Sequence, residues 1–215
     1  MEISMDYKKL IETAVDQKQE TILSASDRIF DYAELGFHEF KSAKLLEEVL
    51  TQEGFQVETG IDGMPTAFKA CYGSGHPVIG FLAEYDALPE LSQKGGCTKR
   101  IPAEGENPDG HGCGHNLLGA GTLAAALAVK EYLKESGKAG TVILFGCPSE
   151  EKGNSKTLMA RDGVFDGVDV AFTWHPSTEN CVVTRSTLAN VSAFFRFKGV
   201  TSHAAASPGM GRSAL

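Results

Sequence analysis

Residues 109–116 read DGHGCGHN, and the rest of the chain can be interpreted outward from this stretch. His111, Cys113 and His115 stand at every second position, and in an extended segment such side chains point to the same face. Imidazole nitrogen and thiolate sulfur are donors that suit a zinc-type divalent ion. The stretch therefore predicts a metal site. The alternative is a polar, glycine-rich loop in which the histidines occur by chance.

The segments around this stretch alternate between strand-like and helix-like patterns. Residues 117–135 follow it directly, are rich in alanine and leucine, and predict a buried helix. Residues 78–83 are nearly all apolar, as in a strand covered on both faces. Further strands are predicted at residues 66–72, 141–145 and 168–174, and further helices at 5–34, 39–53 and 158–165. The sequence therefore predicts an α/β domain with a mostly parallel sheet flanked by helices.

Polar side chains follow three of these strands, close to where each strand ends. They are Asp86, Glu150, Glu151 and His175. Because the carboxyl ends of parallel strands meet at one edge of a sheet, we expect them beside the donors of residues 109–116. Two adjacent carboxylates are unfavourable unless a positive charge lies between them, and a metal ion would supply that charge. One of the pair could then bind the ion while the other handles the protons of a bound water.

Each of these residues also has a simpler interpretation. Asp86 could be a turn residue before Pro89. The two glutamates could form an exposed charged turn, and His175 could be a histidine satisfied within the core. Cys113 could instead be a nucleophile paired with a histidine, which would make a metal-independent hydrolase.

The composition changes after about residue 186. Residues 189–198 alternate between apolar and polar side chains, which predicts a half-exposed strand of the antiparallel type. His203 follows in a loop of small residues. We therefore expect a first domain at residues 1–186 and the beginning of a second domain at 187–215, cut off at the last residue.

Bulk properties narrow the class of protein. The 215-residue chain is 42% hydrophobic and carries a formal net charge of −8, without a lysine- or arginine-rich run, so a core is expected and a nucleic-acid partner is not. The N-terminal sequence MEISMDYKK lacks an apolar signal core, and no run of about 18 apolar residues exists to span a membrane. Five cysteines with scattered spacing favour reduced thiols, and a cytoplasmic location is expected.

Six short motifs together resemble a known family. They are DYAELGFHEF at 31–40, DALP at 86–89, GHGCGHN at 110–116, PSEE at 148–151, WHP at 174–176 and SHAAASP at 202–208. Their order and spacing resemble the dinuclear-metal amidohydrolase and peptidase family of aminoacylases and carboxypeptidase G. Within it, the chain is most similar to the subfamily of aminobenzoyl-glutamate, hippurate and indole-acetyl-amino-acid hydrolases.

The resemblance implies a role for each candidate residue. The implied metal ligands are Cys113, His115, Glu151 and His175, with Cys113 as a thiolate that can bridge two ions. Glu150 is implied as the general base, Asp86 as a residue that supports the site, and His203 as a lid-domain histidine that stabilises the oxyanion. The implied cofactors are two divalent ions, zinc or manganese, with cobalt as a further option. His111 has no implied role in the family.

The implied activity is metal-dependent hydrolysis of the amide bond of an N-acyl amino acid, aminobenzoyl-glutamate or a small dipeptide. The resemblance also implies a lid and dimerisation domain of the α+β type, and a homodimer in the full-length form. Two departures stand out. Asn116 occupies a position where most of the broader subfamily has aspartate, and the family continues well past residue 215. A metal-binding fragment without activity is therefore the alternative.

Overall fold

The computed structural model describes residues 6–153, 155–184, 186, 188–189, 191 and 193–214. The chain divides into two compact units, Met1–Thr178 and Glu179–Leu215. The boundary that we expected at residue 187 lies inside the second unit. The assignment of a catalytic and a lid domain stays a prediction.

The first unit is built on a five-stranded sheet with the order β1-β2-β4-β3-β5. The strands are β1 (Gln56–Thr59), β2 (Phe68–Ser74), β3 (Val78–Ala83), β4 (Gly140–Gly146) and β5 (Val170–Phe172). β3 pairs in parallel with β4 and β5, whereas β2 pairs antiparallel with β1 and β4. The α/β class is confirmed, but the sheet is mixed rather than mostly parallel. The short connection at residues 75–77 is the reason, because a parallel return from β2 to β3 needs a crossover of a dozen or more residues.

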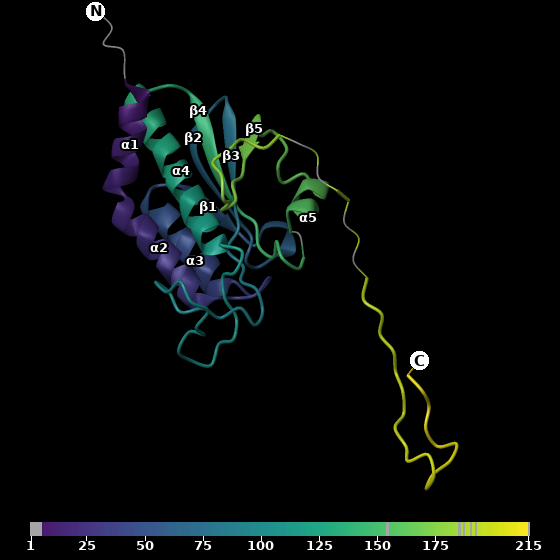
Figure 1. Ribbon diagram of the computed structural model, residues 1–215. Helices are drawn as coiled ribbons and strands as arrows, with labels where there is room; N and C mark the ends of the chain where they lie inside the picture. Colours follow the sequence, from purple (N-terminus) through teal and green to yellow (C-terminus); the bar gives the residue numbers. More distant parts are fainter. Residues whose placement is uncertain are drawn as a thin grey trace, which may run out of the picture. The chain divides into compact units, whose positions relative to one another are not determined.

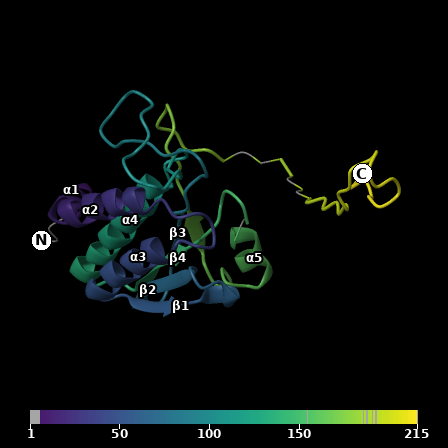
Figure 2. The same cartoon turned by 90° about the horizontal axis from the view of Figure 1, so that it is seen from below.

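Helices cover both faces of this sheet. They are α1 (Tyr7–Gln17), α2 (Gln19–Tyr32), α3 (Phe40–Gln52), α4 (His115–Ser136) and α5 (Ser155–Arg161). Side chains of β4 alternate between two cores: Val142 and Leu144 pack with residues of α2, α3 and α4, while Ile143 and Phe145 pack with Met159 of α5. Figures 1 and 2 accordingly show α5 apart from the other four helices.

Three predicted helices differ from the observed ones. The helix expected at residues 5–34 is two helices that break at Lys18, whose backbone angles are φ −105° and ψ 6°. α4 begins at His115, two residues before the expected start, because Gly114 adopts the left-handed conformation (φ 80°) that precedes the first turn. The last helix lies at Ser155–Arg161 rather than at 158–165.

The strand expected at residues 189–198 is wrong for the described part of that range, where no strand is assigned. Asn190 and Ser192 lie outside the described residues. A strand needs a partner for its backbone, and the described second unit offers a single isolated bridge, between Val200 and Arg212. The sequence pattern also missed β1 and the 3-10 turn at Ile61–Gly63. Among the described residues, no helix combines the length and apolar character that crossing a bilayer requires.

Candidate metal centre

The loops that follow β3, β4 and β5 carry the candidate residues, and α4 begins at the same place. Because these three strands are parallel, their carboxyl ends share one edge of the sheet. Six predicted residues lie together there: Asp86, Cys113, His115, Glu150, Glu151 and His175. Their predicted convergence is thus present in the structure, and their individual roles stay predictions.

His115 lies at the centre of the cluster. Its side chain is fully buried, and its Nδ1 lies 2.8 Å from Asp86 Oδ1. Its Nε2 makes no hydrogen bond among the described residues. An imidazole whose Nδ1–H is held by a carboxylate presents Nε2 as a ligand atom, and a buried polar atom without a partner is costly. The residues present therefore fit a metal ion at Nε2.

Asp86 connects this histidine to the glutamate loop. Its side chain is fully buried, and its second oxygen, Oδ2, accepts a hydrogen bond from the backbone N–H of Glu151 at 3.0 Å. One carboxylate therefore fixes both the ring of His115 and the backbone that carries the two adjacent glutamates. This geometry agrees with the supporting role that was expected for Asp86.

Three carboxylates surround Nε2 of His115. Glu84 Oε2 lies 3.2 Å away, Glu151 Oε1 3.9 Å and Glu150 Oε2 4.0 Å. Partial burial raises the pKa of Glu150, and the charge of Glu84 raises it further. Burial lowers the pKa of His115, but the hydrogen bond to Asp86 and the nearby carboxylates outweigh it, so the pKa is raised overall. A bound cation would relieve the crowding of negative charge.

Cys113 and His175 form the more exposed side of the cluster. Cys113 Sγ lies 3.2 Å from His175 Nε2, and the ring of His175 meets that of His115 edge-on, with centroids 5.8 Å apart. The ligand atoms of these three residues all lie within 4.8 Å of one another. The same holds for Glu84, His115 and Glu150, so two candidate ligand groups meet at one imidazole.

The environment of Cys113 favours metal binding over a free nucleophile. Burial raises the pKa of its thiol to about 12, and the neighbouring Glu151 contributes to the shift. A raised pKa disfavours the thiolate, which is the nucleophilic form of cysteine. A coordinating cation removes the difficulty, because a metal-bound thiol loses its proton.

His111, which was singled out from the sequence, does not join the cluster. His111 Nε2 lies 3.0 Å from the backbone oxygen of Ile29, and burial lowers the pKa of His111 to about 4. The expectation of three donors on one face is wrong for His111, because residues 110–114 form tight turns rather than an extended segment. His203 belongs to the second unit, where its Nδ1 accepts a hydrogen bond from the N–H of Ala206.

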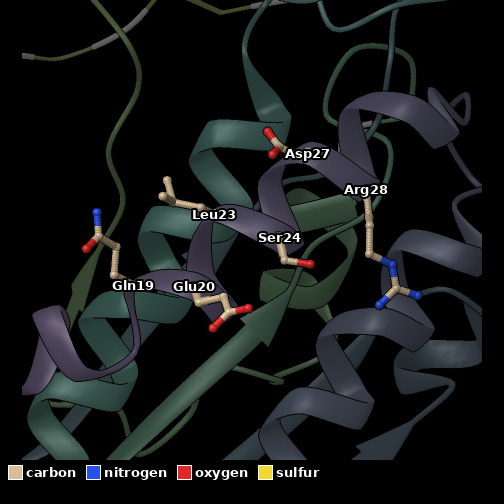
Figure 3. Close-up of a pocket in the computed structure, with 6 residues that line it drawn as sticks. All are labelled: Gln19, Glu20, Leu23, Ser24, Asp27 and Arg28. Carbon is tan, nitrogen blue, oxygen red and sulfur yellow. The ribbon is translucent and has the colours of Figure 1, made fainter.

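A surface hollow elsewhere contains none of these donors. It lies along one face of α2, as Figure 3 shows, and is lined by Gln19, Glu20, Leu23, Ser24, Asp27 and Arg28. The cluster at the sheet edge is therefore the stronger candidate site.

Comparison with known proteins decides the family. The model of peptidase family M20/M25/M40 matches residues 80–206, which include every predicted site residue. The chain belongs to this family. The resemblance inferred from the six motifs is confirmed.

Relatives of this M20 chain include a hydrolase subunit and a dipeptidase. It is 48% identical to one of the subunits of p-aminobenzoyl-glutamate hydrolase from Escherichia coli, over 96% of this chain and 43% of the relative. It is 31% identical to the Xaa-Arg dipeptidase of Mus musculus, over 94% of this chain and 45% of the relative. The M20 chain therefore spans less than half the length of these curated relatives.

A solved structure supports the fold. A dinuclear metal-binding M20 peptidase from Bacillus subtilis superposes with a TM-score of 0.64 at 21% identity, covering 75% of this chain and 44% of the other. At this identity the likeness concerns the fold alone.

The M20 chain contains site residues that sequence reasoning missed. Glu84 follows β3 just as Asp86 does, so the argument from strand ends could have found it. Glu39 is fully buried and accepts a hydrogen bond from the backbone N–H of Ser149 at 2.7 Å, beside the two glutamates. These residues are 110 positions apart, and no local pattern indicates their contact.

Proposed function

We propose that this M20 chain supplies the donor-bearing part of a metal-dependent amidohydrolase. The observation that carries the proposal is the buried imidazole of His115, whose Nε2 has no protein hydrogen bond among the described residues and lies among carboxylate, thiol and imidazole donors. Cys113, His115, Glu151 and His175 would hold two divalent ions, zinc or manganese with cobalt as a further option. Thiolate and imidazole suit zinc, and carboxylates suit manganese.

The proposed substrates are N-acyl amino acids, aminobenzoyl-glutamate and small dipeptides. This choice is supported by the names of the relatives, a p-aminobenzoyl-glutamate hydrolase subunit and an Xaa-Arg dipeptidase. The identity to the first is the greater, so aminobenzoyl-glutamate is the substrate to test first.

Each residue then has a defined part in amide hydrolysis. The bound ions would polarise the scissile carbonyl and lower the pKa of a water toward about 7. Glu150 would act as the general base and later as the acid toward the leaving amine, and burial together with the charge of Glu84 raises its pKa toward neutral pH. Asp86 holds the ring of His115 in place. His203 stabilises the developing oxyanion.

The assembly and location are also proposals. A homodimer of the full-length form is expected, and pairing with a different chain is the alternative, since the Escherichia coli relative is named as a subunit. The five cysteines are free, which agrees with the proposed cytoplasmic location. Light scattering of the purified protein distinguishes a single-chain assembly from a mixed one.

The test combines metal analysis with an assay. The 215-residue chain and a form extended to the length of the relatives are purified, and bound metal is measured by elemental analysis. Hydrolysis of aminobenzoyl-glutamate is then followed with and without a chelator. We expect bound metal and chelator-sensitive hydrolysis. Metal binding without hydrolysis by either form would favour the inactive metal-binding alternative, and hydrolysis that survives complete metal removal would favour the cysteine nucleophile.

A further inference from the structure

Glu84 is a buried carboxylate that the proposed ligand set does not use. It follows β3 directly and is 5% exposed. Its Oε2 lies 3.2 Å from Nε2 of His115, and its Oε1 accepts a hydrogen bond from Lys156 Nζ on α5. Glu84 therefore lies between an ammonium group and the imidazole nitrogen that faces the cluster.

The contact between Glu84 and His115 is close but is not a hydrogen bond. Although the two atoms are close, their geometry does not make a hydrogen bond, and Nε2 of His115 makes none with any other described residue. When Nδ1–H is donated to Asp86, Nε2 presents a lone pair to a carboxylate oxygen that also carries lone pairs. Two acceptor atoms at this distance repel each other unless a cation lies between them. Nε2 of His115 and Oε2 of Glu84 are therefore arranged like two ligands of one metal ion.

Lys156 is the charged partner of the buried Glu84. Its side chain is only 23% exposed and forms an ion pair with Glu84. A buried carboxylate needs a charged or hydrogen-bonding partner, and the ammonium group provides both. The same pairing takes part of the negative charge of Glu84 away from His115. Lys156 and a metal ion would therefore compete for one carboxylate.

We propose that Glu84 is a further metal ligand of this centre, on the same ion as His115, and that Lys156 is its counter-ion, which weakens metal binding. The inference rests on the proposed function, since it requires a metal at His115. The proposal predicts that substitution of Glu84 lowers the zinc affinity, whereas substitution of Lys156 raises it. If the ion pair only stabilised the fold, both substitutions would change the zinc affinity in the same direction.

The test measures zinc affinity rather than activity. The metal-free 215-residue chain competes with a chromophoric chelator for Zn²⁺, and Co²⁺ absorption from a thiolate–metal bond verifies that the ion lies at Cys113. Glu84→Gln preserves the shape and an acceptor for Lys156. We expect this change to lower the zinc association constant by about tenfold or more. Lys156→Met is expected to raise it, because an opposing positive charge is removed.

A matched ion pair provides the control. Lys94 and Glu104 lie 3.7 Å apart on the surface, with side chains 55% and 93% exposed. Lys94→Met and Glu104→Gln are expected to leave zinc affinity unchanged. Thermal unfolding of every variant identifies changes that act through the fold. If Glu84→Gln does not fold, Glu84→Asp keeps the charge on a shorter side chain, and the same fall in affinity is expected.

The outcomes separate this inference from the proposed function. A wild-type chain that binds no zinc overturns both. Zinc binding by the wild-type chain with unchanged affinity in Glu84→Gln overturns the role of Glu84 alone. A parallel fall in both Glu84→Gln and Lys156→Met overturns it as well, because a structural ion pair predicts that result. Opposite shifts support the inference.

Discussion

Two histidine–aspartate pairs lie at opposite ends of the same strands. At the carboxyl ends, His115 Nδ1 is 2.8 Å from Asp86 Oδ1. At the amino ends, His76 Nδ1 is 2.7 Å from Asp169 Oδ2, just before β3 and β5 begin. The side chains of the first pair are fully buried, whereas those of the second are 74% and 46% exposed.

The difference shows that burial, not distance, determines what such a pair does. A buried hydrogen-bonded pair is stronger, and losing one partner leaves the other without compensation. Burial also removes the second nitrogen of His115 from solvent, and a buried polar atom without a hydrogen bond is costly. The exposed pair is screened by solvent and connects two strand ends. We therefore expect the His115–Asp86 pair to hold the candidate site together, and the His76–Asp169 pair to stabilise only the adjacent strand ends.

The largest expected effect comes from breaking the buried pair. Asp86→Ala leaves Nδ1 of His115 and the N–H of Glu151 without their partner. Removing one member of a buried pair costs about 3–5 kcal/mol of unfolding free energy. Chemical denaturation with and without zinc should show this loss together with weaker zinc binding. Asp169→Ala is the matched control and should change neither quantity appreciably. Equal effects of the two changes would contradict the distinction between the pairs.

The second prediction concerns catalysis at the buried end. Glu150 lies 4.0 Å from His115 Nε2 with a side chain 40% exposed, so it can reach a bound water. Glu150→Gln removes the base and keeps the shape. We expect the hydrolysis rate to fall by about 10²–10⁴-fold, with metal content unchanged. Turnover is measured on aminobenzoyl-glutamate and metal by elemental analysis. An unchanged rate would exclude Glu150 as the base.

The third prediction compares two glutamates of the same motif. Glu39 is buried and accepts hydrogen bonds from the N–H of Ser149 and the hydroxyl of Thr66, whereas Glu34 accepts from the first turn of α3. Ser149 has a positive φ of 55°, so its loop depends on such support. Glu39→Ala should cost about 1–3 kcal/mol and also weaken zinc binding.

Glu34→Ala is the control for this comparison. It removes acceptors from a helix terminus and should cost about 1 kcal/mol without changing zinc affinity. Glu39→Gln retains a hydrogen-bond acceptor, so it should keep most of the unfolding free energy and zinc affinity that Glu39→Ala loses. Zinc affinity that is equal in both alanine variants would show that Glu39 supports the fold but not the site.

The predictable part of the site depends on topology. Asp86, Glu150 and His175 follow three parallel strands, and parallel strands must present these loops at one edge. A hydrophobic pattern that identifies the strands therefore also identifies which side chains lie close together after them. The same argument applies to Glu84, which directly follows β3. The roles of these residues stay predictions.

The unpredicted part depends on local geometry and distant contacts. His111 was expected beside Cys113, but tight turns direct it to the backbone of Ile29. The contact of Glu39 with Ser149 joins segments that have no common periodicity. In the second unit, the alternating pattern predicted a strand, yet the side chain of Phe194 is 93% exposed and no ladder forms among the described residues. A strand pattern does not determine whether a partner strand is available.

The smallest expected effect concerns the exposed pair and its pH dependence. Hydrogen bonds from the N–H of Val78 and from His76 hold the pKa of Asp169 below its ordinary value of 3.8. A carboxyl group with a lowered pKa in the folded state stabilises that state above its ordinary pKa, and the stabilisation is lost as the pH falls through the lowered value. The unfolding midpoints of the wild-type chain and of Asp169→Asn should therefore differ slightly at about pH 6 and converge as the pH falls below the ordinary pKa of Asp169 and through its lowered value. A difference that stays constant over this range would show that the charge of Asp169 contributes nothing, and that its side chain acts only as the acceptor of the hydrogen bond from the N–H of Val78.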